Sequence, residues 1–206
     1  MLGLPKSTEL KKQLPKNAIY IKFNMSTAAK EKFDADVKRI VIVNEISPTT
    51  TTVPKGELVE AIFVLLVSLK RENFNVKNIE LIPKLIHQNM LLILEYEGKA
   101  KLSLYHTQLL QTEWKPTEAW TLTLKGLNLD TVWENVIRKI ADHEELEIWS
   151  EELSPDENIA KILRIEKLKK DIEHLGKKAR KELQHRKKFE LVQAINGLRK
   201  ELEGNL

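Results

Sequence analysis

The residues of this sequence best suited to catalysis lie in ILEYEGKAKLSLYHTQLLQTEW, residues 93–114. Glu97 and Lys99 stand two residues apart beside a strand-like run, and Glu95 precedes them on the same run. A Glu-x-Lys pair at this spacing is a common feature of the active sites of metal-dependent nucleases. Such a site needs both residues on a rigid strand and a second acid from a neighbouring strand to bind the cation. Glu95, Glu97 and Lys99 are therefore one candidate catalytic set.

A β-hairpin is the competing interpretation of the same stretch. MLLILEYE and KAKLSLYH are both strand-like, and Gly98 is the only residue between them suited to a tight turn. In the second run Ala100, Leu102 and Leu104 occupy every other position, which is the period of a half-buried strand. No aspartate occurs in residues 37–129, so the second acid would have to be a glutamate. We predict a charged hairpin tip and no catalytic residues, with the nuclease as the alternative.

Other catalytic templates find no match in the sequence. No two of the seven glycines are closer than seven residues, so neither a dinucleotide-binding G-x-G-x-x-G nor a P-loop can be written. The chain has no cysteine, so it offers no thiol nucleophile and no thiolate metal site. The five histidines form no pair at metal-ligand spacing. We predict no metal site and no cofactor, and an enzyme is the less favoured class.

Charge is distributed unevenly along the chain and points to another function. The formal net charge is +4, but residues 161–188 alone contain twelve Lys/Arg against four acids. A basic stretch of this density can neutralise nucleic-acid phosphates. The alternative is that these Lys/Arg side chains only solvate the outer surface of a helix. The residues predicted to contact phosphates are Lys169, Lys170, Lys177, Lys178, Arg180, Lys181, Arg186, Lys187 and Lys188.

The same C-terminal stretch carries an apolar helical seam. Ile165, Leu168, Ile172 and Leu175 follow alternating spacings of three and four, as in a coiled coil, and are the predicted partner-binding residues. The pattern fails at Glu182 and resumes out of phase from Leu191. Either one helix with a phase shift or two helices meeting near QHRKK would produce it. The seam is expected to pack on itself, on the rest of the chain or on a protein partner.

The remaining sequence predicts an α+β body, residues 1–153, followed by a basic helical arm, residues 154–206. Strands are expected at 39–46, 58–70, 90–97, 99–106 and 119–126, forming a mostly antiparallel sheet. A buried helix is the alternative for 58–70, because its continuous apolar run has no decisive period. Helices are expected at 27–40, 75–89 and 129–146, flanking the sheet, with caps from Ser26 or Thr27, from Asn75, and from Asp130 or Thr131. The C-terminal arm is a long helix or a helical hairpin.

Membrane association is not expected. The longest apolar run, AIFVLLV, is far shorter than the ~20 residues that a membrane helix needs. The first residues, MLGLPKSTELKKQLPK, interrupt any apolar segment with charges and prolines, unlike a signal peptide. We expect a soluble, cytoplasmic protein.

Five segments occur in an order that resembles a known family: LPKNAIY, AIFVLLVSLK, QTEW, KGLNLDTVWENVIRKIA and KKFELVQAINGLRKELE. Together they span nearly the whole chain and resemble the bacterial and archaeal domain of unknown function 4391 family. The family has no established activity, and its genes often lie beside helicases and DNA methyltransferases in restriction or phage-defence loci. The resemblance implies a non-catalytic accessory protein of a DNA-directed defence system. Its expected partner is such a helicase or methyltransferase, or a second copy of the chain.

Overall fold

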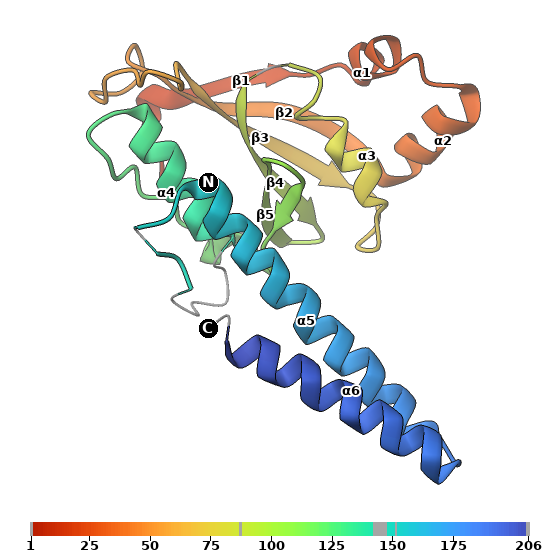
Figure 1. Ribbon diagram of the computed structural model, residues 1–206. Helices are drawn as coiled ribbons and strands as arrows, with labels where there is room; N and C mark the ends of the chain where they lie inside the picture. The colour runs from red at the N-terminus through yellow and green to blue at the C-terminus, as the bar shows by residue number, and fades with distance from the viewer. Residues whose placement is uncertain (1, 87, 142–147, 151, 205–206) are drawn as a thin grey trace. The chain divides into compact units, whose positions relative to one another are not determined.

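The computed structural model describes residues 2–86, 88–141, 148–150 and 152–204. Figure 1 shows a twisted sheet with helices around it and the long helices of the C-terminal segment. The elements in chain order are η1 (Lys6–Thr8), β1 (Glu9–Gln13), α1 (Lys16–Lys22), α2 (Thr27–Asp36), β2 (Val37–Ile46), β3 (Ile62–Leu69), α3 (Val76–Glu80), β4 (Asn89–Tyr96), β5 (Lys99–Tyr105), β6 (Leu109–Gln111), β7 (Lys115–Pro116), η2 (Thr117–Ala119), α4 (Leu129–Ala141), α5 (Pro155–Lys181) and α6 (His185–Glu203).

The chain divides into two compact units, Met1–His143 and Glu144–Leu206. The first contains the whole sheet and is called the body here; the second contains α5 and α6 and is called the arm. The divide lies ten residues before the boundary expected after residue 153.

The body is built on one seven-stranded sheet with the order β1-β2-β3-β4-β5-β6, and β7 pairs with β5. Every pairing is antiparallel except that of β3 with β4, which run parallel from Ile62 opposite Asn89. A parallel pair needs a crossover, and α3 lies in the connection between these two strands. The predicted α+β fold with a mostly antiparallel sheet is confirmed.

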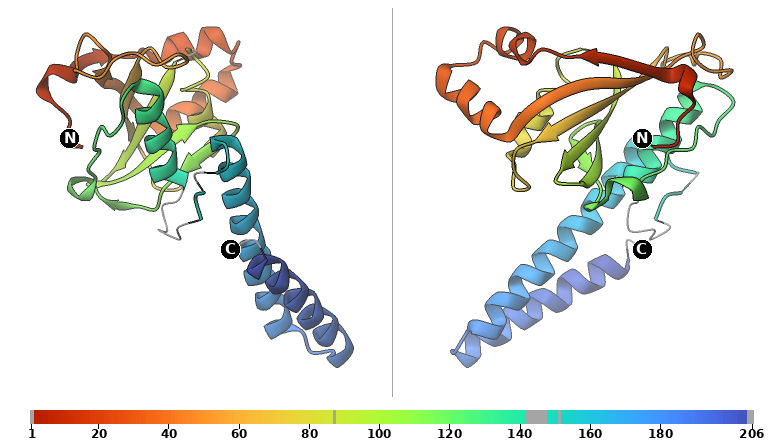
Figure 2. Two further views of the ribbon diagram at one scale, coloured as in Figure 1. Left: turned by 60° about the vertical axis from the view of Figure 1, so that its left-hand side comes forward. Right: turned by 180° about the vertical axis from the view of Figure 1, so that it is seen from behind.

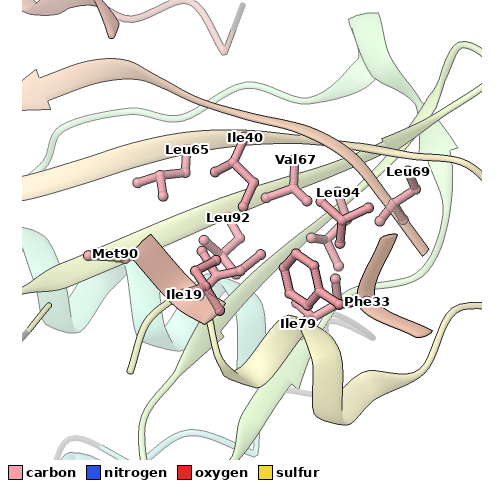
Figure 3. Packing of buried hydrophobic residues seen from close by; sticks show 12 residues of the cluster. Ile19, Phe33, Ile40, Leu65, Val67, Leu69, Ile79, Met90, Leu92 and Leu94 are labelled. Carbon is pink, nitrogen blue, oxygen red and sulfur yellow. The ribbon is translucent and has the colours of Figure 1, made fainter. Parts of the chain in front are cut away.

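The main core lies where helices α1, α2 and α3 cover one face of the sheet (Figure 3). Alternate residues of β3 and β4 point into it, because side chains in a strand change face at every residue. Its buried members are Ile19, Phe33, Val37, Ile40, Leu65, Val67, Leu69, Ile79, Ile82, Met90, Leu92 and Leu94.

The intervening residues of the central strands are also buried. Leu91 and Ile93 of β4 pair with Leu104 and Leu102 of β5, and all four are at most 1% exposed. Helix α4 packs beside β5 and β6 and buries its own apolar stripe, which includes Val132 and Val136. Burial on both faces explains why β3 and β4 read as continuous apolar runs rather than as alternating ones.

A buried polar network fixes the end of α2 to the loop after β3. The Asp36 carboxylate is fully buried and forms an ion pair with Arg71. It also accepts hydrogen bonds from the Asn75 backbone N–H at 3.0 Å and from Asn78 Nδ2 at 2.6 Å. Each partner satisfies part of a charge that would otherwise be costly to bury.

Two predicted helices of the body were too long, and one predicted strand was wrong. The helix expected over 27–40 ends at Asp36, directly before β2 begins. The helix expected over 75–89 ends at Glu80, because Pro83 has no N–H to donate and its ring would collide with the Ile79 carbonyl. The strand expected over 119–126 is absent from that segment, where Thr121 makes only an isolated bridge to Leu2. The outer pairings on β5 are instead made by the short β6 and β7, which the sequence did not predict.

The predicted capping residues were partly right. Ser26 and Asn75 cap α2 and α3 with their side chains, as expected. For α4 the cap is Asn128, whose Oδ1 accepts from the Thr131 N–H at 3.0 Å, rather than Asp130 or Thr131. The Asp130 carboxylate is engaged by the backbone N–H groups of residues 57–59. Positions 142–146 of the predicted helix lie outside the described residues.

Within the described part of the chain, no helix combines the length and apolar character needed to cross a membrane.

Candidate nucleic-acid interface

The arm is a helical hairpin that starts from a strongly specified N-terminus. Ser154 Oγ accepts from the Glu157 N–H at 3.3 Å, and the Glu157 carboxylate accepts from the Ser154 N–H at 2.9 Å, so the two form a capping box. Pro155 occupies the first helical position, where its missing N–H costs nothing. The hydrogen bonds from Ser154 lower the pKa of the Glu157 carboxyl. α5 therefore begins at a position that the local sequence dictates.

The turn between α5 and α6 resolves the alternative that the sequence left open. α5 ends at Lys181 and α6 begins at His185, so two antiparallel helices meet near QHRKK (Figure 2). An ion pair between Arg164 and Glu201 joins the helices far from the turn. The seam lost its phase at Glu182 because the chain reverses there.

The predicted partner-binding residues lie on the stretch of α5 that runs beside α6. Ile165 and Leu168 are buried, while Ile172 and Leu175 are half-buried. On α6 the apolar residues with matching spacing are Leu191, Ile195, Leu198 and Leu202. The seam thus supplies the interior of the hairpin.

Most of the predicted phosphate-contacting residues gather at the turn, in a segment called the basic tip here, residues 177–188. This segment contains seven Lys/Arg and one acid, and all seven basic side chains are exposed. They are Lys177, Lys178, Arg180, Lys181, Arg186, Lys187 and Lys188. Lys169 and Lys170 lie about 10 Å or more further along α5, at 1.5 Å per residue. The structure therefore brings together seven of the nine predicted residues and sets two apart.

Few acids neutralise the basic tip. Lys177 pairs with Glu173 at 2.6 Å and Arg186 with Glu190 at 3.4 Å, each one turn away on the same helix. Among the residues that the structure describes, the other four tip lysines form no ion pair; they are Lys178, Lys181, Lys187 and Lys188. Four cations are thus free to bind an external anion.

The start of α6 offers few groups that would neutralise the basic tip. Gln184 provides no side-chain hydrogen bond to the start of α6, and the first turn of α6 contains no acid. The N-terminus of α6 is the positive end of its dipole, but the C-terminus of α5 at the same turn is a negative end. The two dipoles oppose each other there, so the positive potential of the tip comes from its side chains. A hollow of about 590 Å³ opens at this end of the arm, lined by Lys178, Lys181, Glu182, Lys187, Glu190 and Leu191.

The alternative nuclease set lies at the β4–β5 turn, as the hairpin interpretation predicted. Glu97 (φ 46°) and Gly98 (φ 79°) form a two-residue turn, in which both central residues adopt positive φ. Glu95 pairs with Ala100 and Tyr96 with Lys99, so Glu95 and Lys99 point to opposite faces of the sheet. Glu97 is exposed at the tip. The three side chains therefore do not converge on one point.

Among the residues that the structure describes, no three histidine, aspartate or glutamate side chains are placed together so that they could hold a metal ion. A second hollow, of about 620 Å³, opens in the body and includes Lys84 and Tyr105. Lys84 Nζ lies 4.3 Å from the centre of the Tyr105 ring and 3.2 Å from Glu80 Oε2. These contacts satisfy the Lys84 ammonium group within the protein.

Sequence reasoning missed three apolar residues of the arm that the structure leaves exposed: Leu183, Phe189 and Val192. The position of Phe189 outside the hairpin interior could have been predicted from its spacing in the sequence. Phe189 falls outside the helical spacing of Leu191, Ile195 and Leu198, so it could not lie on the inner side of α6.

One family model matches the chain, over residues 2–202, and its description is "Domain of unknown function (DUF4391)". The match covers both units. No curated protein and no solved structure matches the chain.

Proposed function

The chain belongs to the DUF4391 family. We propose that it is a non-catalytic adaptor that binds nucleic-acid phosphates through the basic tip of its arm. The observation that carries the proposal is the exposure of seven Lys/Arg side chains around the turn between α5 and α6, four of them without an acidic partner in the described chain. We further propose that the adaptor serves a DNA-directed defence system, in contact with a helicase or methyltransferase.

The hairpin supports this role because it holds the charges in place. Packing of the seam residues Ile165, Leu168 and Ile195 orders α5 and α6, and the lysines project from helices instead of from a flexible tail. Lysine and arginine on such a scaffold bind phosphates by displacing condensed counterions, without reading base sequence. The expected binding is therefore strong at low salt and weak in sequence preference.

A charge-removal variant tests the proposal. Replacing Lys178, Lys181, Lys187 and Lys188 by glutamine should weaken binding to a fluorescent oligonucleotide, measured by anisotropy over a range of salt concentrations. Each phosphate contact contributes about −0.9 to the slope of log K against log salt for duplex DNA. If all four lysines contact phosphates, the slope should become less steep by roughly 3.6.

The matched control removes the same number of charges from the body. Lys11, Lys12, Lys22 and Lys125 are all exposed, and their replacement by glutamine should leave the salt slope unchanged. Equal weakening by both variants would show a response to net charge alone and would contradict the proposal. Absence of binding by the parent protein at ~50 mM salt would contradict it as well.

A further inference from the structure

The basic tip and the residues of α6 that directly follow it expose apolar side chains. Leu183 in the turn is 92% exposed, and Phe189 and Val192 on α6 are 62% and 40% exposed. Phe189 follows directly after Arg186, Lys187 and Lys188, and it is the only Phe, Tyr or Trp in α5 and α6. Single exposed apolar residues are common on protein surfaces, but here one lies in the basic tip and two lie within four residues of its end.

Helical geometry sets Phe189 apart from the hairpin interior. At 100° per residue, Phe189 lies about 120° around the α6 axis from the buried Ile195. Val192 lies between the two, about 60° around the axis from each, and is 40% exposed. The Phe189 ring therefore does not fill the seam, and its neighbours in sequence are cations.

We propose that the basic tip prefers single-stranded nucleic acid, with an unstacked base packing on the Phe189 ring while the adjacent lysines and Arg186 bind the flanking phosphates. This inference rests on the proposed function and names the substrate class of the same site. An aromatic side chain beside a basic track is the arrangement by which proteins bind single strands, since every base has a face that can stack. In a duplex these faces are covered by neighbouring base pairs and only the phosphates are available.

The composition of the tip favours a nucleic acid over a lipid surface. A helix that inserts into a membrane interface presents a continuous apolar side. Around Phe189 and Val192 the exposed residues of α6 include Glu190, Gln193 and Asn196, which interrupt such a side. Seven cations against three exposed apolar residues match a phosphate polymer with occasional base contacts.

The test compares conservative variants of Phe189 on two probes, an oligothymidylate and a duplex, both of about 20 nucleotides per strand so that each exceeds the footprint of one small site. Phe189→Leu keeps the apolar volume but removes the stacking face, and should weaken oligothymidylate binding about tenfold. Duplex binding should change by less than about twofold, because phosphate contacts remain. Phe189→Tyr keeps the face and should bind like the parent.

Several results would overturn the inference. Equal binding of oligothymidylate by Phe189→Leu and the parent, or an equal loss on both probes, would show that the ring does not stack on a base. A loss in Phe189→Tyr as large as in Phe189→Leu would contradict it too. So would binding to phosphatidylglycerol vesicles that falls with Phe189→Ala while oligothymidylate binding is unchanged. The lysine-to-glutamine variant separates the two proposals, since it should weaken both probes whatever Phe189 does.

Discussion

Replacement of Asp36 by alanine should destabilise the body more than any other single carboxylate deletion near α2. Asp36 ends α2, and its carboxylate accepts from Asn75 at 3.0 Å and Asn78 at 2.6 Å while pairing with Arg71. Alanine would remove all three acceptor contacts at once. The loop after β3 and the start of α3 would lose the group that fixes them to α2.

The size of the stability loss depends on the hydrogen-bonding and charged groups that lose Asp36 as their partner. Asn78 is only 8% exposed, so its Nδ2 group would lose its strongest acceptor without full access to water. A buried donor without a partner costs ~1–3 kcal/mol, and breaking a buried ion pair costs ~3–5 kcal/mol. Arg71 is half-exposed and can be rehydrated, which argues for the lower end, about 3 kcal/mol. A whole domain is stable by only ~5–15 kcal/mol, so the loss should be easy to measure.

Urea unfolding followed by tryptophan fluorescence would measure the change in the free energy of unfolding, because Trp120 and Trp133 are buried in the body. Asp34→Ala is the matched control, two residues earlier on the same helix. Asp34 is 43% exposed and binds Lys16 and Tyr20, so its loss should cost about 1 kcal/mol or less. If Asp36→Ala loses less than about 1 kcal/mol, or no more than Asp34→Ala, the network does not hold the loop and the reasoning is refuted.

Two further predictions concern single turns of the backbone. Glu97 adopts φ 46° in the β4–β5 turn, a conformation that Asn tolerates better than Glu. Glu97→Asn should therefore raise the free energy of unfolding by about 0.5 kcal/mol in the same urea assay. A lower free energy of unfolding would contradict the assigned turn. The Glu157 pKa lies below its ordinary 4.5, so the capping box contributes stability above that pH and loses it as pH falls through the folded-state value. Amide exchange in the first turn of α5, corrected for the intrinsic effect of pH, should therefore become less protected in acid. Glu157→Gln should show no such pH dependence, and an equal response in both proteins would count against the capping box.

The sequence by itself determined features that depend on neighbouring residues. Gly98 between two strand-like runs specified the hairpin, because one residue free to adopt positive φ is enough to close a tight turn. Ser26, Asn75 and Ser154 specified helix starts, because a cap needs a side-chain acceptor within two or three residues. The number of basic residues in the C-terminal segment and their positions in the sequence do not depend on the fold.

Only the tertiary structure decided which distant residues meet. Asp36 and Asn78 are 42 positions apart, and nothing in either local sequence pairs them. The parallel pairing of β3 with β4, and the use of β6 and β7 in place of a strand at 119–126, depend on which backbone edges are left open once the core has packed. In the arm, chain reversal near Glu182 concentrated the charges at one end, because antiparallel packing of the seam buries more apolar surface than two separate helices would. That packing also placed Phe189 outside the interior, where its ring faces the solvent.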